Sequence, residues 1–90
     1  TIPAGALIES CEVFITGTLS GGTNFNLGLS QPDGTVIDAD GLVAAETATS
    51  GAVVGAGALV GTSLSAAGQL TLSGTRTAGE LTVVITYKVA

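Results

Sequence analysis

Apolar and polar residues alternate along both ends of the chain. In the C-terminal stretch ELTVVITYKVA, residues 80–90, one face carries the apolar residues Leu81, Val83, Ile85, Tyr87 and Val89. In LIESCEVFITGTL, residues 7–19, the inward positions are Cys11, Val13, Ile15 and Leu19, and the outward ones are Glu12, Phe14, Thr16 and Thr18. A two-residue period is typical of strands with one buried face. The pattern therefore predicts a long strand at each end of the domain.

Turn residues separate two further strands from the first one. After SGGT, residues 20–23, the segment NFNLGLS presents Phe25, Leu27 and Leu29 on one face. The next segment is QPDG, residues 31–34, whose proline and glycine suit the backbone angles of a tight turn. TVID then returns as a short strand. We therefore predict a three-strand meander over residues 12–38.

The middle of the chain, residues 39–63, is rich in Gly and Ala and has no clear period. Two elements are expected in it. One is a helical stretch of one or two turns within residues 42–48. The other is a strand over residues 53–60 that bends at Gly55 and Gly57.

Short strands resume after the middle segment. QLTLS, residues 69–73, points Leu70 and Leu72 inward, and GTRTAG turns the chain into the last strand near Glu80. Six to eight short strands separated by glycine fit an all-β sandwich with Greek-key or jelly-roll-like connections. Heptads and long helical segments are absent, which excludes a coiled coil and a βαβ fold. We expect residues 1–90 to form one such domain.

Two short sequences recur at a similar spacing. AGALIE at Ala4 is similar to AGALVG at Ala56, and TLSGGT at Thr18 is similar to TLSGTRT at Thr71. Two related halves, one for each sheet, would produce this recurrence. Chance recurrence of common residue types is the alternative.

Charged residues are rare in this chain. They make up 10% of it, against roughly 25% in a typical soluble domain. The net charge is −5, with Arg76 and Lys88 as the cations. We expect no nucleic-acid partner, because neutralising phosphates needs a basic stripe. No apolar run approaches the roughly 20 residues that span a bilayer, so we also expect no membrane partner.

Small size and missing cross-links favour self-association. The single cysteine cannot form an internal disulfide, and aromatic residues are 3% of the chain, so the core must be aliphatic. Small domains of this kind often gain stability by assembling. We therefore expect a homo-oligomer. Because the chain has no methionine, we take Thr1 to follow a trimmed or processed start.

No set of residues suits catalysis. Histidine is absent from the sequence, so the usual general base is missing. Cys11 falls on an inward face, where we expect a buried hydrophobic side chain with no base to activate it. Glu9 and Glu12 are expected on opposite faces of one strand, which would prevent an acid–base pair. The sequence predicts no enzyme, no catalytic residue and no cofactor.

The segment DADG, residues 38–41, invites comparison with a calcium-binding loop. Two aspartates at alternate positions before a glycine occur in such loops. The EF-hand template fails, because Val36 and Thr47 stand where it needs ligands, and Glu46 is one residue short. A simple turn with solvated carboxylates is the plainer interpretation. We expect no metal site.

Two apolar residues interrupt the polar outer faces of the end strands. They are Phe14 in the first strand and Val84 in the last. Single exposed apolar residues are common on soluble proteins. Neighbouring ones form a contact patch. The sequence therefore predicts an interface at Phe14 and Val84 if the two strands lie side by side.

Four stretches of the chain resemble small β-rich structural proteins of tailed bacteriophage virions. They are IPAGALI, NFNLGLSQPDGTVIDADGL, GALVGT and TAGELTVVITYKVA. The resemblance is to head decoration or cement proteins and to related head-fibre or knob modules. It implies a non-enzymatic protein on the outer capsid surface that bridges or caps the major capsid protein. It also favours a trimer, because icosahedral shells offer threefold sites.

Two other classes of function are alternatives. A receptor- or carbohydrate-binding module of a phage tail or cell-surface protein would expose aromatic side chains, and Phe14, Phe25 and Tyr87 are the aromatic residues of this chain. A pilus-like subunit would exchange strands between copies. An unguarded strand edge pairs with other chains, so we expect the edge of the last strand to be closed by the partner sheet, a neighbouring copy or the capsid surface. Lys88 is the only basic residue of this strand.

Overall fold

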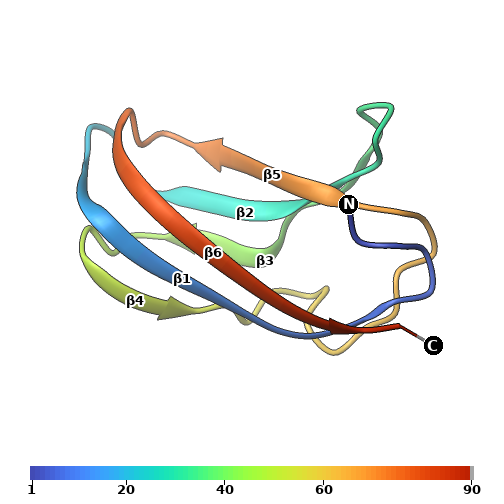
Figure 1. The fold of residues 1–90 in the computed structure, drawn as a ribbon. Helices are drawn as coiled ribbons and strands as arrows, with labels where there is room; N and C mark the ends of the chain where they lie inside the picture. The colour runs from blue at the N-terminus through green and yellow to red at the C-terminus, as the bar shows by residue number, and fades with distance from the viewer. Residues whose placement is uncertain (90) are drawn as a thin grey trace.

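The computed structural model describes residues 1–89, which form six strands and no helix. The strands are β1 (Leu7–Ser20), β2 (Phe25–Ser30), β3 (Val36–Glu46), β4 (Gly51–Val54), β5 (Gln69–Gly74) and β6 (Ala78–Lys88). They make two antiparallel three-stranded sheets, in the orders β4-β1-β6 and β3-β2-β5 (Figure 1). The two sheets pack together, so the predicted all-β sandwich is confirmed, and the strand number is within the predicted range.

The core is aliphatic and draws on both sheets and the loops between them. Among the buried residues of the described chain, Phe25 is the one aromatic residue. The buried apolar residues are Ile2, Ala6, Ile8, Cys11, Val13, Leu19, Phe25, Leu27, Leu29, Leu42, Val43 and Leu64. Burial of this apolar surface is the main favourable contribution to folding.

The longest ladder joins the two end strands, β1 and β6. Cys11 lies opposite Ile85, and Val13 lies opposite Val83. Directly opposite residues point to the same face of a sheet. The alternating residues of the two strands therefore make one apolar inner face, and the predicted faces of the first strand are confirmed by the burial of Cys11 and Val13.

Ile8 is a core residue that strict alternation misses. It is fully buried, as is Cys11 three positions later. The β1–β6 ladder changes register between Ile8 and Ser10, which makes Glu9 the extra residue of a β-bulge. The bulge changes which residues of β1 face inward. Strict alternation therefore cannot place Glu9 relative to Glu12, and both residues are exposed.

The predicted three-strand meander over residues 12–38 is wrong. β1 and β2 do not pair; they are the central strands of opposite sheets. Gly21 and Gly22, with φ of 72° and 56°, turn the chain from one sheet to the other. Leu19 and Phe25 on either side of this turn are both buried in the core. A sequence period shows which face of a strand is buried, but not which strand lies beside it.

Only β2 and β3 form the expected hairpin. Its turn is the predicted one: Gly34 has a φ of 93°, and its N–H donates to the carbonyl of Gln31 at 2.9 Å. β3 then continues to Glu46, so the predicted helical turns over residues 42–48 are wrong. Leu42 and Val43 are both buried because the β2–β3 ladder shifts register there. Two adjacent apolar residues break the two-residue period of a strand and are also typical of the buried face of a helix.

The strand predicted over residues 53–60 is correct only at its start. β4 ends at Val54, and residues 58–61 form turns. The N–H of Gly55 donates to the carbonyl of Cys11, and the N–H of Leu59 donates to the carbonyl of Gly41. These bonds fold the segment against β1 and β3 instead of extending it.

The two TLSG sequences end β1 and β5, and both strands are followed by a crossing between the sheets. The two crossings touch: the N–H of Thr23 donates to the hydroxyl of Thr75 at 2.8 Å. Because each TLSG half contributes strands to both sheets, the arrangement of one related half per sheet is wrong. The last strand begins at Ala78, two residues before its expected start.

Candidate interaction surface

Phe14 and Val84 lie close together on the outer face of the β4-β1-β6 sheet. Phe14 is opposite Thr82 and Val84 is opposite Glu12, so the two apolar side chains are diagonal neighbours across the ladder. Diagonal neighbours are about 7–8 Å apart, within reach of an aromatic ring. Phe14 is 40% exposed and Val84 is 44% exposed. The predicted interface required the first and last strands to lie side by side, and the β1–β6 pairing places them so.

A third residue extends this group on the other side of β1. Val54 of β4 is opposite Glu12 and is 76% exposed. We call Phe14, Val54 and Val84 the outer patch. Glu12 lies in the middle of it, between Val54 and Val84. The sequence pattern does not single out Val54, because the alternation of residues within a strand does not show how β4 pairs with β1.

A second apolar surface lies on the inner side of β5. Leu70 is opposite Leu29, and Leu72 is opposite Leu27, so all four residues belong to one face. Leu27 and Leu29 are buried, whereas Leu70 is 46% exposed and Leu72 is 60% exposed. Leu70 and Leu72 therefore lie on the inner face, as predicted. The opposite sheet, however, does not cover them.

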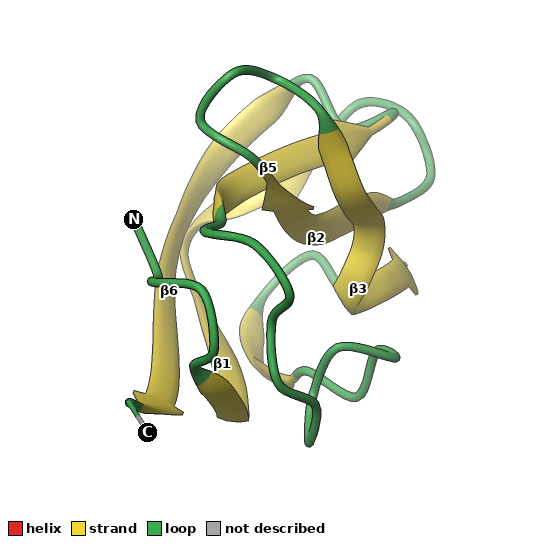
Figure 2. Ribbon diagram, turned by 90° about the vertical axis from the view of Figure 1, so that its right-hand side faces the viewer, coloured by secondary structure: helices red, strands yellow, loops and turns green. Residues whose placement is uncertain are grey.

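β6 has the same incomplete cover. Its inner residues Leu81, Val83 and Ile85 pack against the core but are only half-buried, and Tyr87 is exposed. β5 and β6 are edge strands of opposite sheets, and they border the same side of the sandwich. Figure 2 shows β6 as the outermost strand at the left, with β5 to its upper right. We call the opening between their inner faces the seam.

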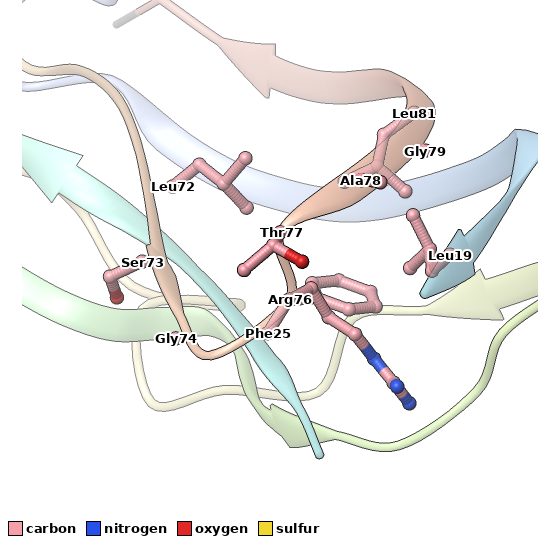
Figure 3. Close-up of a pocket in the computed structure, with 10 residues that line it drawn as sticks. All are labelled: Leu19, Phe25, Leu72, Ser73, Gly74, Arg76, Thr77, Ala78, Gly79 and Leu81. Carbon is pink, nitrogen blue, oxygen red and sulfur yellow. The ribbon is translucent and has the colours of Figure 1, made fainter. Parts of the chain in front are cut away.

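Loops close the two ends of the seam. At one end the N-terminal segment crosses it: the N–H of Ile2 donates to the carbonyl of Gly68 at 2.7 Å, next to the start of β5. At the other end the β5–β6 loop borders an open pocket of about 390 Å³. Leu19, Phe25, Leu72 and Leu81 give this pocket an apolar lining (Figure 3).

Arg76 fastens the loop at the pocket end. Its guanidinium donates to the carbonyls of Gly21 and Gly22 at 3.3 Å each, and to the carbonyl of Thr47 at 2.8 Å. Figure 3 shows this side chain extending away from the apolar lining. Arg76 therefore joins three loops through its hydrogen bonds. Its charge is occupied by backbone carbonyls, which makes it a structural residue in this fold.

Cys11 lies in the core, as predicted. It is fully buried, and burial raises the pKa of its thiol above the ordinary value. The charge of the neighbouring Glu12 raises this pKa further. Both effects disfavour the thiolate, which is the nucleophilic form.

Asp38 and Asp40 lie within strand β3 and not in the turn that was expected. The N–H of Asp40 donates to a carboxylate oxygen of Asp38 at 3.3 Å. A hydrogen bond between the two carboxyl groups, together with the charge of Asp38, raises the pKa of Asp40. Among residues 1–89, no three acidic or cysteine side chains come together as they would around a metal ion.

No protein-family model, curated protein or solved structure matches the chain. Within residues 1–89 there is also no helix of the length and hydropathy needed to cross a membrane. Two apolar surfaces of the described residues, the outer patch and the seam, are the features that bear on function.

Proposed function

We propose that this chain is a non-enzymatic structural module that decorates or cements a bacteriophage capsid. It works by protein–protein contact on the outer capsid surface of the virion, with the major capsid protein and further copies of itself as partners. The observation that carries the proposal is the outer patch. Phe14 and Val84 are neighbours by register, and Val54 extends the same exposed surface.

The chemistry of this surface favours a protein partner. Its apolar residues are large for exposed positions, and contiguous exposed apolar surface marks contact sites on soluble proteins. Thr16, Thr82 and Thr86 are exposed around it, and Glu12 in its middle is the one charge whose desolvation a partner would have to offset. The resemblance of the chain to head decoration proteins supplies the capsid as the partner.

The aromatic residues do not favour the alternative of a carbohydrate-binding module. Phe25 is buried in the core. Phe14 lies on the outer face of β1, whereas Tyr87 is opposite the buried Ile8 and so lies on the inner face of β6. The two exposed aromatic side chains therefore face opposite sides of one sheet and form no common platform for a sugar ring.

Co-sedimentation with capsid shells that lack this protein tests the proposal. The native chain should pellet with shells of the phage that encodes it. Val54→Asp should lose this binding, because it places a charge in the outer patch at a position that is 76% exposed. Val36→Asp is the matched control: it makes the same change at a 61% exposed position of the other sheet, and it should pellet like the native chain. Failure of the native chain to bind shells would overturn the proposal.

A further inference from the structure

β6 is the least protected strand edge of the molecule. It runs from Ala78 to Lys88, and it pairs only with β1 among the described residues. The register shifts of the β1–β6 ladder fall where β1 carries extra residues. Residues 80–88 of β6 itself pair with β1 without a gap. Proteins usually guard such an edge with proline, a bulge or an inward-pointing charge. β6 has none of these between its ends.

The other edges are shorter or more irregular. β4 and β5 contain four and six residues. β3 contains register shifts and a residue of positive φ, Ala45 at 48°. Irregular and short edges are poor templates for pairing with another chain. A second chain would therefore find its best main-chain template on β6.

The side chains of β6 make it complementary to itself. Side chains alternate between the two faces of a strand, so only every second register of an antiparallel partner keeps the inner residues of both strands on one side. One of these registers puts Val84 opposite Val84 of the other copy, and it then puts Glu80 opposite Lys88. The same register pairs Leu81 with Tyr87 and Val83 with Ile85, which are the half-buried and exposed residues along the seam.

The charges select this register over its neighbours. Glu80 and Lys88 are the only charged residues of β6, and both are exposed. They are eight positions apart on one strand, about 27 Å, so they cannot pair within one copy. A shift of two residues in either direction removes the direct Glu80–Lys88 pairing. In a twofold dimer the pairing occurs twice.

We propose that two copies of this chain pair through their β6 edges in this antiparallel register. The contact joins the two β4-β1-β6 sheets into one six-stranded sheet and packs Leu81 of each copy beside Tyr87 of the other, and Val83 beside Ile85. It also places the two Val84 residues at the twofold axis with a Phe14 beside each. The outer patches of the two copies thus become one continuous surface on the same side of the joined sheet.

This inference deepens the proposed function, since it names the surface by which copies associate, and it replaces a threefold arrangement with a twofold one. A threefold ring would have to pair different edges, such as β6 with β5 of the next copy. β5 carries no charged residue, so Glu80 and Lys88 would find no partner along it. Pairing with β5 would thus leave both charges of β6 unmatched, whereas the twofold contact matches both of them.

Charge reversal on the isolated protein tests the pairing. Glu80→Lys puts two lysines opposite each other at both ends of the contact, and Lys88→Glu puts two glutamates there. Each variant should dimerise at least roughly tenfold more weakly than the native chain, because attractive cross-strand pairs become repulsive ones. The double variant should regain dimerisation. An equimolar mixture of the two single variants should form a mixed dimer, in which every facing pair is again of opposite charge.

Native mass spectrometry and sedimentation equilibrium read out these species, and 1 M salt should reduce the differences by screening. A native chain that is monomeric or trimeric would overturn the inference. So would single variants that dimerise like the native chain, or weakened variants that do not recover on mixing. Shell binding is measured separately: a monomer that binds shells overturns only the twofold contact, and a dimer that ignores shells overturns only the proposed function.

Discussion

Leu72 lies directly opposite Leu27 in the β2–β5 ladder, yet Leu27 is 1% exposed and Leu72 is 60% exposed. The two leucines share one face of one sheet. Leu27 is covered by the opposite sheet, whereas Leu72 lies at the seam. The apolar inner layer of this sandwich is therefore wider than the cover that one copy provides.

Truncation of these two leucines should distinguish the covered core from the open seam. Leu27→Ala should lower the free energy of unfolding by about 2–5 kcal/mol, because it leaves a cavity in a packed core. Leu72→Ala should cost less than about 1 kcal/mol, since the removed atoms are already largely in water. Denaturant unfolding at low protein concentration measures both values. Equal losses would show that the seam is closed within one copy.

Cys11 should react slowly with a thiol reagent. Its side chain is fully buried, and both burial and the charge of Glu12 raise its pKa, so the reactive thiolate is scarce and inaccessible. Labelling followed by mass spectrometry should be slow in buffer and fast in denaturant. Rapid stoichiometric labelling of the native protein would mean that the faces of β1 are reversed.

Removal of the Arg76 guanidinium should destabilise the fold. Arg76→Ala breaks the hydrogen bonds to the carbonyls of Gly21, Gly22 and Thr47, and we expect a loss of about 1–2 kcal/mol in the free energy of unfolding. Arg76→Lys keeps the charge but cannot reproduce the planar fork, so its loss should be intermediate. Thermal unfolding provides the measurement. A lysine variant as stable as the native chain would reduce the role of Arg76 to its charge.

Asp40→Asn should stabilise the protein at neutral pH. The hydrogen bond with Asp38 and the charge of Asp38 raise the pKa of Asp40. A carboxyl whose pKa is raised on folding favours the folded state while it is protonated, and this contribution is lost as the pH rises through the folded pKa. The advantage of the variant should therefore be absent in acid and appear as the pH rises. Unfolding curves across this range measure it.

Asp33→Asn is the control with the opposite sign. The N–H of Thr35 donates to the Asp33 carboxylate at 2.9 Å, and hydrogen bonding from Thr35 lowers the pKa of Asp33. This contribution to stability is present above the unfolded pKa and is lost as the pH falls through the folded pKa. The variant should be less stable than the native chain at neutral pH. If both variants changed the stability in the same direction, the opposite pKa shifts of Asp33 and Asp40 would be wrong.

The sequence predicts single strands well and their partners poorly. Residues 11–19 and 80–89 alternate well enough to define their faces, whereas the bulge at Glu9 hides the buried Ile8, and QPDG identifies its turn. Pairing of β1 with β6 depends on contacts between distant parts of the chain, which a local period does not contain. Adjacent apolar residues such as Leu42 and Val43 also look the same in a helix and in a strand with shifted register.

The candidate surfaces were predictable only in part. Phe14 and Val84 stand out because they interrupt polar faces, but their proximity follows from the β1–β6 register. Leu70 and Leu72 look like core residues in the sequence, and only the width of the opposite sheet leaves them exposed. The self-complementary charges of β6 become meaningful once β6 is known to be an edge.

The mass of the isolated protein under native conditions shows whether copies pair through β6. If assembled copies provide the missing cover of β6, native mass spectrometry should show a dimer, and Val84→Asp should convert it to a folded monomer by placing two carboxylates at the twofold axis. Val36→Asp, with the same substitution on the other sheet, should remain a dimer. A native chain that is monomeric at all concentrations would rule out pairing through β6.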